Sequence, residues 1–531
     1  MKKNIFIFFA ILMTGSTINS AFAQKMFSKN FFGPMSTQSI TDIRQSSDGG
    51  YFMTGTVRNS TSFFDMVLLK LDVAGNLIWN KAYGSTGGDF GYSVIESQGS
   101  GYVIAGSIWQ YATNRDFYIV KTDPAGDTLW TRTYGSLGDD DANKILEIID
   151  GYIIGGVREI SDGTDISIIK ITFAGDIEWS KNFYGPFNES LSDIILIKDG
   201  SVIITGSIRR NISSSSDILL MKISSTGESI WSKTYEVSDD DFGNSVYQTF
   251  DNGFILCGTA GTLRDISLLK TDSAGNSEWS KTFGGNQIDF GSKAIQLSDS
   301  AYILTGSYRL PNLTISSLLI KLNSIGDTLF SRIYIDSDSL RLNVASSLEV
   351  TNDNGFIMAG NPDMGILKTD SLGRSCKPYI SGIPMHSIIT YVNPIVLVEG
   401  SGLTETATIE SVYSLKLETV SCSILTGLNP IKNNIHELHS LLQNYPNPFN
   451  PVTHLEFGIA PYSRQGGNFG FISLKVYDVL GNEVAAFINE KKNPGIYEVE
   501  FDGKDFPSGI YFYSLILDGN VVDTKRMILL K

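Results

Sequence analysis

Residues 116–135 read DFYIVKTDPAGDTLWTRTYG, and residues 265–284 read DISLLKTDSAGNSEWSKTFG. Each stretch has an alternating apolar run, a turn that contains glycine, and a second run that carries a large aromatic residue. Period-2 alternation on both sides of a glycine turn predicts a β-hairpin. The chain repeats this hairpin many times, so the repeat determines the expected fold.

Three residues that recur at fixed spacing allow the copies to be counted. The turn glycines are Gly75, Gly126, Gly175, Gly227, Gly275, Gly326 and Gly373. Each is preceded by a lysine: Lys70, Lys121, Lys170, Lys222, Lys270, Lys321 and Lys368. Six are followed by a large aromatic residue: Trp79, Trp130, Trp179, Trp231, Trp279 and Phe330. The copies are about fifty residues apart, a period that is typical of propeller blades or linear arrays.

Each unit holds four short predicted strands, which in the second unit are residues 92–96, 102–108, 116–122 and 128–134. A four-stranded antiparallel sheet cannot bury both of its faces alone, so it must stack on its neighbours. The seventh unit stops at residues 374–376 without an aromatic strand, and residues 27–33 (FSKNFFG) match the aromatic strand at 179–185 (WSKNFYG). We therefore predict that strand 27–33 closes the last blade of a seven-bladed β-propeller, residues 24–376.

Composition and charge narrow the class of protein. The chain has 531 residues, a hydrophobic content of 42% and a net charge of −15. An acidic surface argues against nucleic acid as a partner, because the phosphate backbone attracts basic surfaces. The composition fits an extracellular protein with a large core.

Residues 1–23 have the pattern of a signal peptide. Lys2 and Lys3 precede an apolar run at residues 5–13, and Ala21-Phe22-Ala23 forms a cleavage site before Gln24. No later run of apolar residues is long enough to span a membrane, so we expect no transmembrane segment. The expected location is secreted or on the outer cell surface.

The three cysteines are Cys257, Cys376 and Cys422. Cys257 lies in an apolar run (FILCG), which predicts burial. Cys376 and Cys422 flank the segment after the ring and could form a disulfide in an oxidising compartment. Residues 377–437 break the repeat, and we expect extra strands and a linker there.

Residues 438–531 form a separate module with four motifs: LQNYPNPFNPVT at 442–453, LKVYDVLGNE at 474–483, PSGIY at 507–511 and KRMILLK at 525–531. In this order they resemble the C-terminal type A sorting domain of type IX secretion substrates, found in Bacteroidetes and related phyla. The resemblance implies a small Ig-like antiparallel β-sandwich that the outer-membrane translocon recognises. It also implies removal of the domain and release of the cargo or its attachment to surface glycolipid. The implied motif residues are Asn444, Tyr445, Pro446, Asn447, Pro448, Phe449, Asn450, Pro451, Gly481, Gly509, Tyr511, Lys525 and Lys531.

The repeat region resembles the secreted propeller-like repeats that accompany such tails, and this resemblance implies no activity. All four histidines (His386, His436, His439 and His454) lie outside the ring. Catalysis by Ser-His-Asp or Cys-His groups, and zinc held by histidine, are therefore not expected in the ring.

Carboxylates recur after the aromatic strands: Asp89, Asp139, Asp140, Asp141, Asp239, Asp240, Asp241, Asp289, Asp336 and Asp338. In a meander these loops share a face with the segments before Asp65, Asp116, Asp165, Asp217, Asp265 and Asp363, so we expect an acidic face. Turn chemistry explains such residues best. Calcium is the one cofactor that they suggest, and paired carboxylates for glycoside chemistry are a third interpretation.

The tryptophans at the Trp79 position are predicted to pack in the core because their register is strict. Trp109 breaks this register, and with Gln110 and Tyr111 it forms a predicted exposed loop that could stack on a sugar. We expect a non-catalytic binding, adhesion or scaffold protein, with a glycan or protein ligand on the propeller face. The alternative is an extracellular polysaccharide hydrolase or lyase that uses Asp and Glu residues. No residue is assigned to catalysis, cofactor or metal.

Overall fold

The computed structural model describes residues 26–32, 38–58, 63–99, 101–109, 114–161, 163–185, 188–209, 215–237, 240–261, 264–310, 314–335, 344–361, 364–377, 379–381, 385–387, 391–394, 398–401, 404–406, 411–413, 418–424, 440–441, 444, 447–459, 471–479, 481–491, 495–517 and 519–531. Within these ranges the regular elements are strands, and no helix could serve as a membrane span. The all-β prediction is confirmed. The predicted signal peptide, with Ala21, Ala23 and Gln24, lies outside the described residues.

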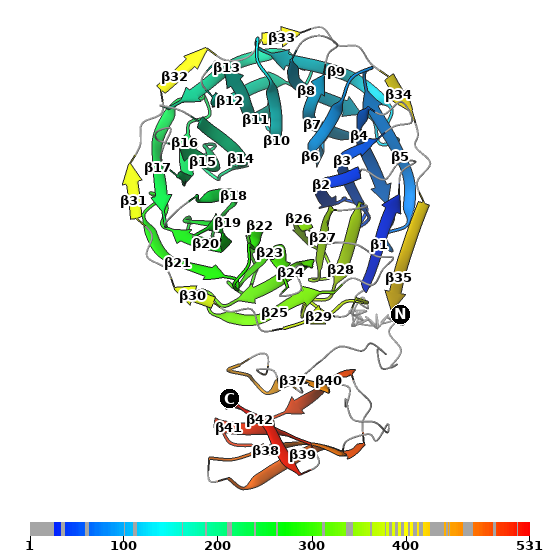
Figure 1. Cartoon of the computed structure of the whole chain (residues 1–531), viewed down its shortest axis with the longest axis vertical. Helices are drawn as coiled ribbons and strands as arrows, with labels where there is room; N and C mark the ends of the chain where they lie inside the picture. Colours follow the sequence, from blue (N-terminus) through cyan, green and yellow to red (C-terminus); the bar gives the residue numbers. More distant parts are fainter. Residues whose placement is uncertain are drawn as a thin grey trace, which may run out of the picture.

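Seven five-stranded sheets surround a central axis (Figure 1). We number them blades 1 to 7, in the order in which their innermost strands follow along the chain. Four strands of each blade pair as an antiparallel meander from the axis outwards, and a fifth strand covers the outer edge. The predicted β-propeller fold is confirmed.

The strands of the blades occupy the following ranges. From blade 1 to blade 7, the innermost strands are β2 (Gln38–Gln45), β6 (Asp89–Glu96), β10 (Asp140–Ile148), β14 (Asn188–Leu196), β18 (Phe242–Gln248), β22 (Phe290–Gln296) and β26 (Val344–Val350). The second strands are β3 (Tyr51–Arg58), β7 (Tyr102–Trp109), β11 (Gly151–Ile160), β15 (Val202–Arg209), β19 (Phe254–Ala260), β23 (Tyr302–Arg309) and β27 (Phe356–Asn361). The third strands are β4 (Phe64–Leu71), β8 (Arg115–Thr122), β12 (Gly163–Thr172), β16 (Ser216–Ile223), β20 (Asp265–Thr271), β24 (Ile315–Leu322) and β28 (Gly365–Thr369). The fourth strands are β5 (Leu77–Gly84), β9 (Thr128–Gly135), β13 (Ile177–Tyr184), β17 (Ser229–Glu236), β21 (Ser277–Phe283), β25 (Thr328–Tyr334) and β1 (Met26–Phe32).

Blade 7 joins the two ends of the ring segment. β1 runs antiparallel to β28, with Phe27 opposite Lys368 and Asn30 opposite Gly365. The chain thus enters and leaves the ring in one sheet. The outer edge of β28 therefore has a partner and is not open to other chains.

The segment after the ring supplies the fifth strand of every blade. These strands and their partners are β29 (Tyr379–Ile380) on β25, β30 (Met385–Ser387) on β21, β31 (Tyr391–Pro394) on β17, β32 (Val398–Ser401) on β13, β33 (Thr404–Thr406) on β9, β34 (Ser411–Tyr413) on β5 and β35 (Glu418–Ile424) on β1. The segment passes around the outside from blade 6 back to blade 1, and then to blade 7, against the chain order of the blades (Figure 1). It covers the outer edges that a four-stranded blade would leave unpaired.

The hydrophobic core lies between the blades. One cluster combines Phe31 and Ile366 of blade 7 with Ile40, Met53 and Leu69 of blade 1, all fully buried. The other propeller clusters likewise draw on adjacent blades. Each sheet face is thus buried by its neighbour, as the stacking argument requires.

The repeated tryptophans are half-buried at the blade boundaries and pack against the core clusters there, which agrees with their predicted role as packing residues. Trp279 of blade 5 lies against Gly326 in a turn of blade 6, where an added Cβ would be 3.0 Å from the indole. Gly326 has a φ of 84°, which an L-residue adopts only with strain. The boundary therefore requires both the aromatic ring and the glycine.

A tyrosine near the end of several fourth strands reinforces these boundaries. The hydroxyl of Tyr83 donates to the carbonyl of Gly126 at 2.7 Å, and that of Tyr235 donates to Gly275 at 2.6 Å. Both tyrosines are fully buried. A buried hydroxyl needs such a partner, and here it joins one blade to the turn of the next.

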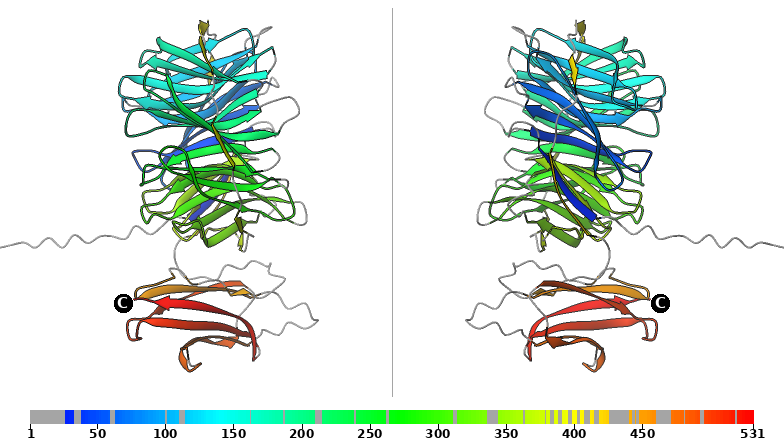
Figure 2. Two further views of the ribbon diagram at one scale, coloured as in Figure 1. Left: turned by 90° about the vertical axis from the view of Figure 1, so that its left-hand side faces the viewer. Right: turned by 90° about the vertical axis from the view of Figure 1, so that its right-hand side faces the viewer.

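The C-terminal domain is a small β-sandwich beside the ring (Figure 2). One sheet contains β36 (Ser440–Leu441), β37 (Val452–Ile459) and β40 (Gly495–Asp502). The other contains β39 (Glu483–Lys491), β38 (Phe471–Tyr477), β41 (Gly509–Leu517) and β42 (Asn520–Leu529). Leu455, Phe457, Leu474, Tyr513 and Leu529 are buried between them. The predicted antiparallel sandwich is confirmed.

The cysteines differ in state. Cys257 is free and buried, as predicted. Cys376 forms a disulfide. The third cysteine of the sequence, Cys422, lies in β35, opposite Ser28 of β1.

Candidate functional site

The innermost strand of every blade carries a β-bulge at its midpoint. The bulged residues are Thr41, Tyr92, Asn143, Ser192, Asn244, Ser292 and Ser346. A bulge adds one residue to a strand and redirects its side chain. Here all seven residues line one cavity on the propeller axis.

Several bulged residues tie one blade to the next. Thr41 donates to the carbonyl of Gly91 at 2.8 Å, Asn244 donates to Gly291 at 2.7 Å, and Ser346 donates to Ile40 at 2.7 Å. Asn143 donates to Leu191 in the same way. These side chains are therefore engaged in hydrogen bonds with backbone carbonyls in the wall of the cavity.

The residue after each bulge forms a second ring: Asp42, Ser93, Lys144, Asp193, Ser245, Lys293 and Ser347. Four of them accept a backbone N–H from the next blade. Asp42 accepts from Val94 at 3.3 Å, Asp193 from Val246 at 3.1 Å, Ser245 from Ala294 at 3.2 Å and Ser347 from Ile43 at 3.4 Å. A lysine amine cannot accept a hydrogen bond, so Lys144 and Lys293 depart from this rule.

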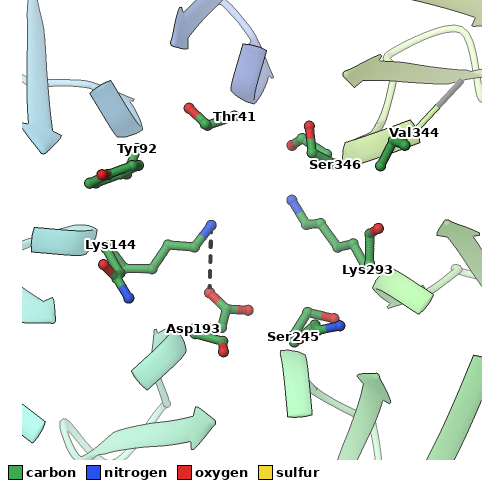
Figure 3. A pocket seen from close by; sticks show the side chains of 13 residues that line it. Thr41, Tyr92, Lys144, Asp193, Ser245, Lys293, Val344 and Ser346 are labelled. Atoms are coloured by element: carbon green, nitrogen blue, oxygen red, sulfur yellow. Dashed lines mark ion pairs between the residues drawn. The ribbon is translucent and has the colours of Figure 1, made fainter. Parts of the chain in front are cut away.

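The cavity has a volume of about 410 Å³, and most of its lining residues carry a hydroxyl, amide or amine group. Lys144 and Lys293 enter it from different walls (Figure 3). The Nζ of Lys144 lies 3.9 Å from Oδ1 of Asp193. No hydrogen bond or ion pair joins the Lys293 amine to any of the described residues.

The charges around the cavity influence one another. Burial alone would raise the pKa of Asp42, but Arg44, Lys144 and Lys293 hold it well below its usual range. Burial and the nearby Arg44 lower the pKa of Lys293 to about 8, although Glu349 and Asp42 oppose this shift. Asp42 is thus stabilised as an anion, while the Lys293 amine lacks a close ion-pair partner among the described residues.

An aromatic row leads from the cavity onto one face of blades 1 and 2. Tyr92 stacks on Phe90 with ring centroids 6.4 Å apart, and Phe90 contacts Phe64 at 5.6 Å. All three rings are half-buried. Trp109 is 49% exposed, which agrees with the predicted exposure. An added Cβ at Gly88 would lie 3.5 Å from Phe90 and 3.7 Å from Trp109, so these two rings flank the same loop.

The prediction of an acidic face is wrong for four of these aspartates, because the blades bury them. Asp89, Asp140, Asp241 and Asp289 are fully buried. Each accepts a backbone N–H from its own loop, as Asp89 does from Ser85 at 2.6 Å. Turn chemistry at a blade boundary therefore explains these residues. Asp139, Asp141 and Asp240 are partly exposed and form ion pairs with Arg115 or Arg264, whereas Asp239, Asp336 and Asp338 lie outside the described residues.

Several of these carboxylates lie close to a second one. Burial, and then the neighbouring Asp65, raises the pKa of Asp89 to about 7. Burial and Asp116 likewise raise the pKa of Asp140 to about 7, and burial and Asp265 raise that of Asp289 to about 6. Among the described residues no group of three His, Cys, Asp or Glu side chains could hold a metal ion.

The predicted sorting residues converge on the last strand. Phe449 is buried, its N–H donates to the carbonyl of Ile528 at 2.9 Å, and its carbonyl accepts from Leu530 at 2.9 Å. Asn447 accepts from the N–H of Ile528 at 2.8 Å. Two motifs at opposite ends of the domain therefore form one unit. Asn444 and Tyr511 are also buried. The other described motif residues lie at least partly at the surface: Pro448, Asn450, Pro451, Gly481, Gly509, Lys525 and Lys531. Tyr445 and Pro446 lie outside the described residues.

Fold and motifs together define a β-propeller that carries a C-terminal export domain. Residues 443–530 match the family described as the secretion system C-terminal sorting domain. The C-terminal domain is therefore a type IX secretion sorting domain, which interacts with the secretion machinery, and the protein is secreted to the cell surface or the extracellular space. No curated protein matches the chain.

The comparison with solved structures gives several matches of low sequence identity. The WD40 propeller domain of Doa1 is 12% identical, with 64% of this chain and 96% of that chain covered and a TM-score of 0.41. Sqt1 from Chaetomium thermophilum is 12% identical, with 66% and 100% covered and a TM-score of 0.39. PorZ of Porphyromonas gingivalis, a surface component of its type IX secretion system, is 10% identical, with 94% and 100% covered and a TM-score of 0.23.

The sequence interpretation missed the cavity residues, although a signal for them exists. The segments FGYS at 90–93, FGNS at 242–245 and FGSK at 290–293 align across three blades. This alignment places Lys293 where the other two blades have serine. The replacement of serine by lysine at this position is therefore the sequence signal for the cavity.

Proposed function

We propose that this secreted propeller is a non-catalytic glycan-binding protein of the cell surface. The observation that carries the proposal is the aromatic row of Tyr92, Phe90, Phe64 and Trp109, which begins in the polar cavity. Sugar rings bind through apolar faces on aromatic side chains and through hydroxyls on polar ones. The row and the cavity supply both kinds of contact next to each other.

The position of the acidic pairs also supports binding over catalysis. A glycosidase needs two carboxylates on either side of an accessible bond. Asp89 and Asp65 are 0% and 1% exposed. A polysaccharide cannot reach carboxylates that the blades cover, so we do not assign them to hydrolysis.

The test is a glycan array with the chain lacking residues 1–23, with and without calcium, compared with a Phe90→Ala and Trp109→Ala double variant. We expect binding to a defined group of saccharides and its loss in the double variant. Thermal unfolding of the variant gives the folding control. Binding to no saccharide, or binding that the double variant keeps, would reject the proposal. Turnover of a bound saccharide would instead favour the hydrolase or lyase.

A further inference from the structure

The two lysines of the second ring occupy positions that hold acceptors elsewhere. In blades 1, 4, 5 and 7 the corresponding side chain binds the N–H of the next inner strand. Lys144 and Lys293 give up this contact and place an amine in the cavity instead. A departure from a local structural rule is expected where function requires it.

The anions near the cavity are already engaged. Asp42 accepts from Ser347 at 3.0 Å, from Ser93 at 3.3 Å and from Val94 at 3.3 Å. Asp193 accepts from Val246, and its other oxygen faces Lys144 at 3.9 Å. Asp42 is therefore bound by the wall, and Asp193, which lines the cavity, faces Lys144, whereas the Lys293 amine has no such partner among the described residues and remains available to a ligand.

We propose that the cavity selects anionic saccharides, and that the Lys293 amine binds their carboxylate or sulfate group. This inference rests on the proposed glycan binding and names its substrate class. Lys144 lies in the same cavity and adds a second positive charge, which Asp193 partly compensates. Charge-assisted hydrogen bonds to an ammonium group are the stronger class of polar contact, so a single amine can decide between acidic and neutral sugars.

The test measures affinities of the chain lacking residues 1–23 by calorimetry for three probes: an oligogalacturonate, a sulfated galactan oligosaccharide and a neutral galactan oligosaccharide. We expect the acidic probes to bind more tightly than the neutral one, and the two acidic arms to show whether carboxylate or sulfate is preferred. Lys293→Met should weaken binding of the acidic probe by roughly 10- to 100-fold and leave the neutral probe unchanged.

Two further variants serve as controls. Lys198→Met replaces an exposed lysine in the turn after β14 and should bind all probes as the wild type does. Lys293→Arg retains the charge and should restore most of the preference for the acidic probes. Thermal unfolding separates a folding defect in Lys293→Met from a binding defect.

A pH series provides an independent readout. The other titratable groups that face this amine are Asp42 and Arg44 on β2, Tyr92 on β6, Lys144 on β10, Asp193 on β14 and Glu349 on β26. The amine loses its charge above its pKa of about 8. Binding of the acidic probe should therefore weaken between pH 7 and pH 9.5, and this change should be absent in Lys293→Met.

The outcomes separate the two proposals. Equal binding of neutral and acidic probes, or an unchanged preference in Lys293→Met, would overturn the anionic selectivity and leave glycan binding intact. Binding of none of the saccharides, on the array or in solution, would overturn both.

Discussion

The guanidinium of Arg332, on the outer part of blade 6, donates a hydrogen bond of 2.9 Å to the carboxylate of Glu456 in the C-terminal domain. The hydroxyl of Tyr379 donates to the same carboxylate at 3.1 Å. All three side chains are buried. The propeller and its sorting domain therefore share a buried ionic contact, and blade 6 holds the domain that the export machinery reads.

This contact predicts that Arg332→Met separates the two domains. Glu456 would remain buried without its cation, at a cost of about 3–5 kcal/mol. We expect calorimetry to show a separate, lower-temperature transition for the C-terminal domain. Lys504→Met is the control, because Lys504 is 66% exposed and its ion pair with Asp502 should contribute at most about 1 kcal/mol. Equal effects of the two substitutions would argue against the buried contact.

The tryptophan–glycine boundary predicts that Trp279→Ala lowers the free energy of unfolding by about 2–4 kcal/mol, since the indole is only half-buried. Gly326→Ala should destabilise as well, because the new Cβ meets Trp279 at a φ that strains alanine. Chemical denaturation measures both. Trp109→Ala and Gly99→Ala should have little effect, since Trp109 is exposed and no atom lies within 4 Å of a Cβ on Gly99.

The buried acidic pairs predict an unusual pH dependence. The folded-state pKa of Asp89 is about 7, above its unfolded value near 4, so the folded state favours the protonated form. The corresponding stability is present below about pH 4 and is lost as the pH rises to 7, at about 1.4 kcal/mol for each pKa unit. Asp89→Asn should stay uncharged and gain stability relative to wild type at pH 8. A constant difference between the two proteins from pH 4 to pH 8 would contradict this.

Pairing of β1 between β28 and β35 predicts that residues 26–32 are required for the ring. Deleting them exposes the edges of both partner strands, and exposed edges promote aggregation. We expect loss of cooperative unfolding and a shift to large species in size-exclusion chromatography. A monomeric deletion variant with unchanged thermal unfolding would show that blade 7 does not need this strand.

Contacts between Phe449 and the last strand predict that residues 525–531 are needed for export. Their removal takes away Leu529, which is buried in the sandwich, and the carbonyl of Ile528 that Phe449 binds. The propeller should stay folded, because its sheets contain no residue from this strand. We expect the truncated chain to accumulate in the periplasm, as measured by fractionation of a native-host strain. Wild-type amounts outside the cell would contradict the role of this strand.

Repeated local patterns are the reason that the fold and the export route could be predicted from the sequence alone. The hairpin at 116–135 needs only alternation, a glycine turn and a fixed register, all of which are local properties, and the tail motifs at 442–453 and 525–531 are equally local. They predict the β-propeller, the sandwich and the route of export. Trp109 was predicted to be exposed because it breaks the register of its unit, and the structure agrees.

Contacts between blades could not be predicted from the sequence in the same way. Asp89 has the same local sequence signal whether its loop lies in water or under a neighbouring blade, and only the packing of blades 1 and 2 buries it beside Asp65. Six of the seven strands of residues 379–424 have only two to four residues, too few to show periodicity, and the free outer edges of the blades determine where they pair. The aligned segments mark Lys293 as a departure from serine, but only the assembled ring shows what that departure does, because seven bulges bring their side chains around one cavity and place the amine in it.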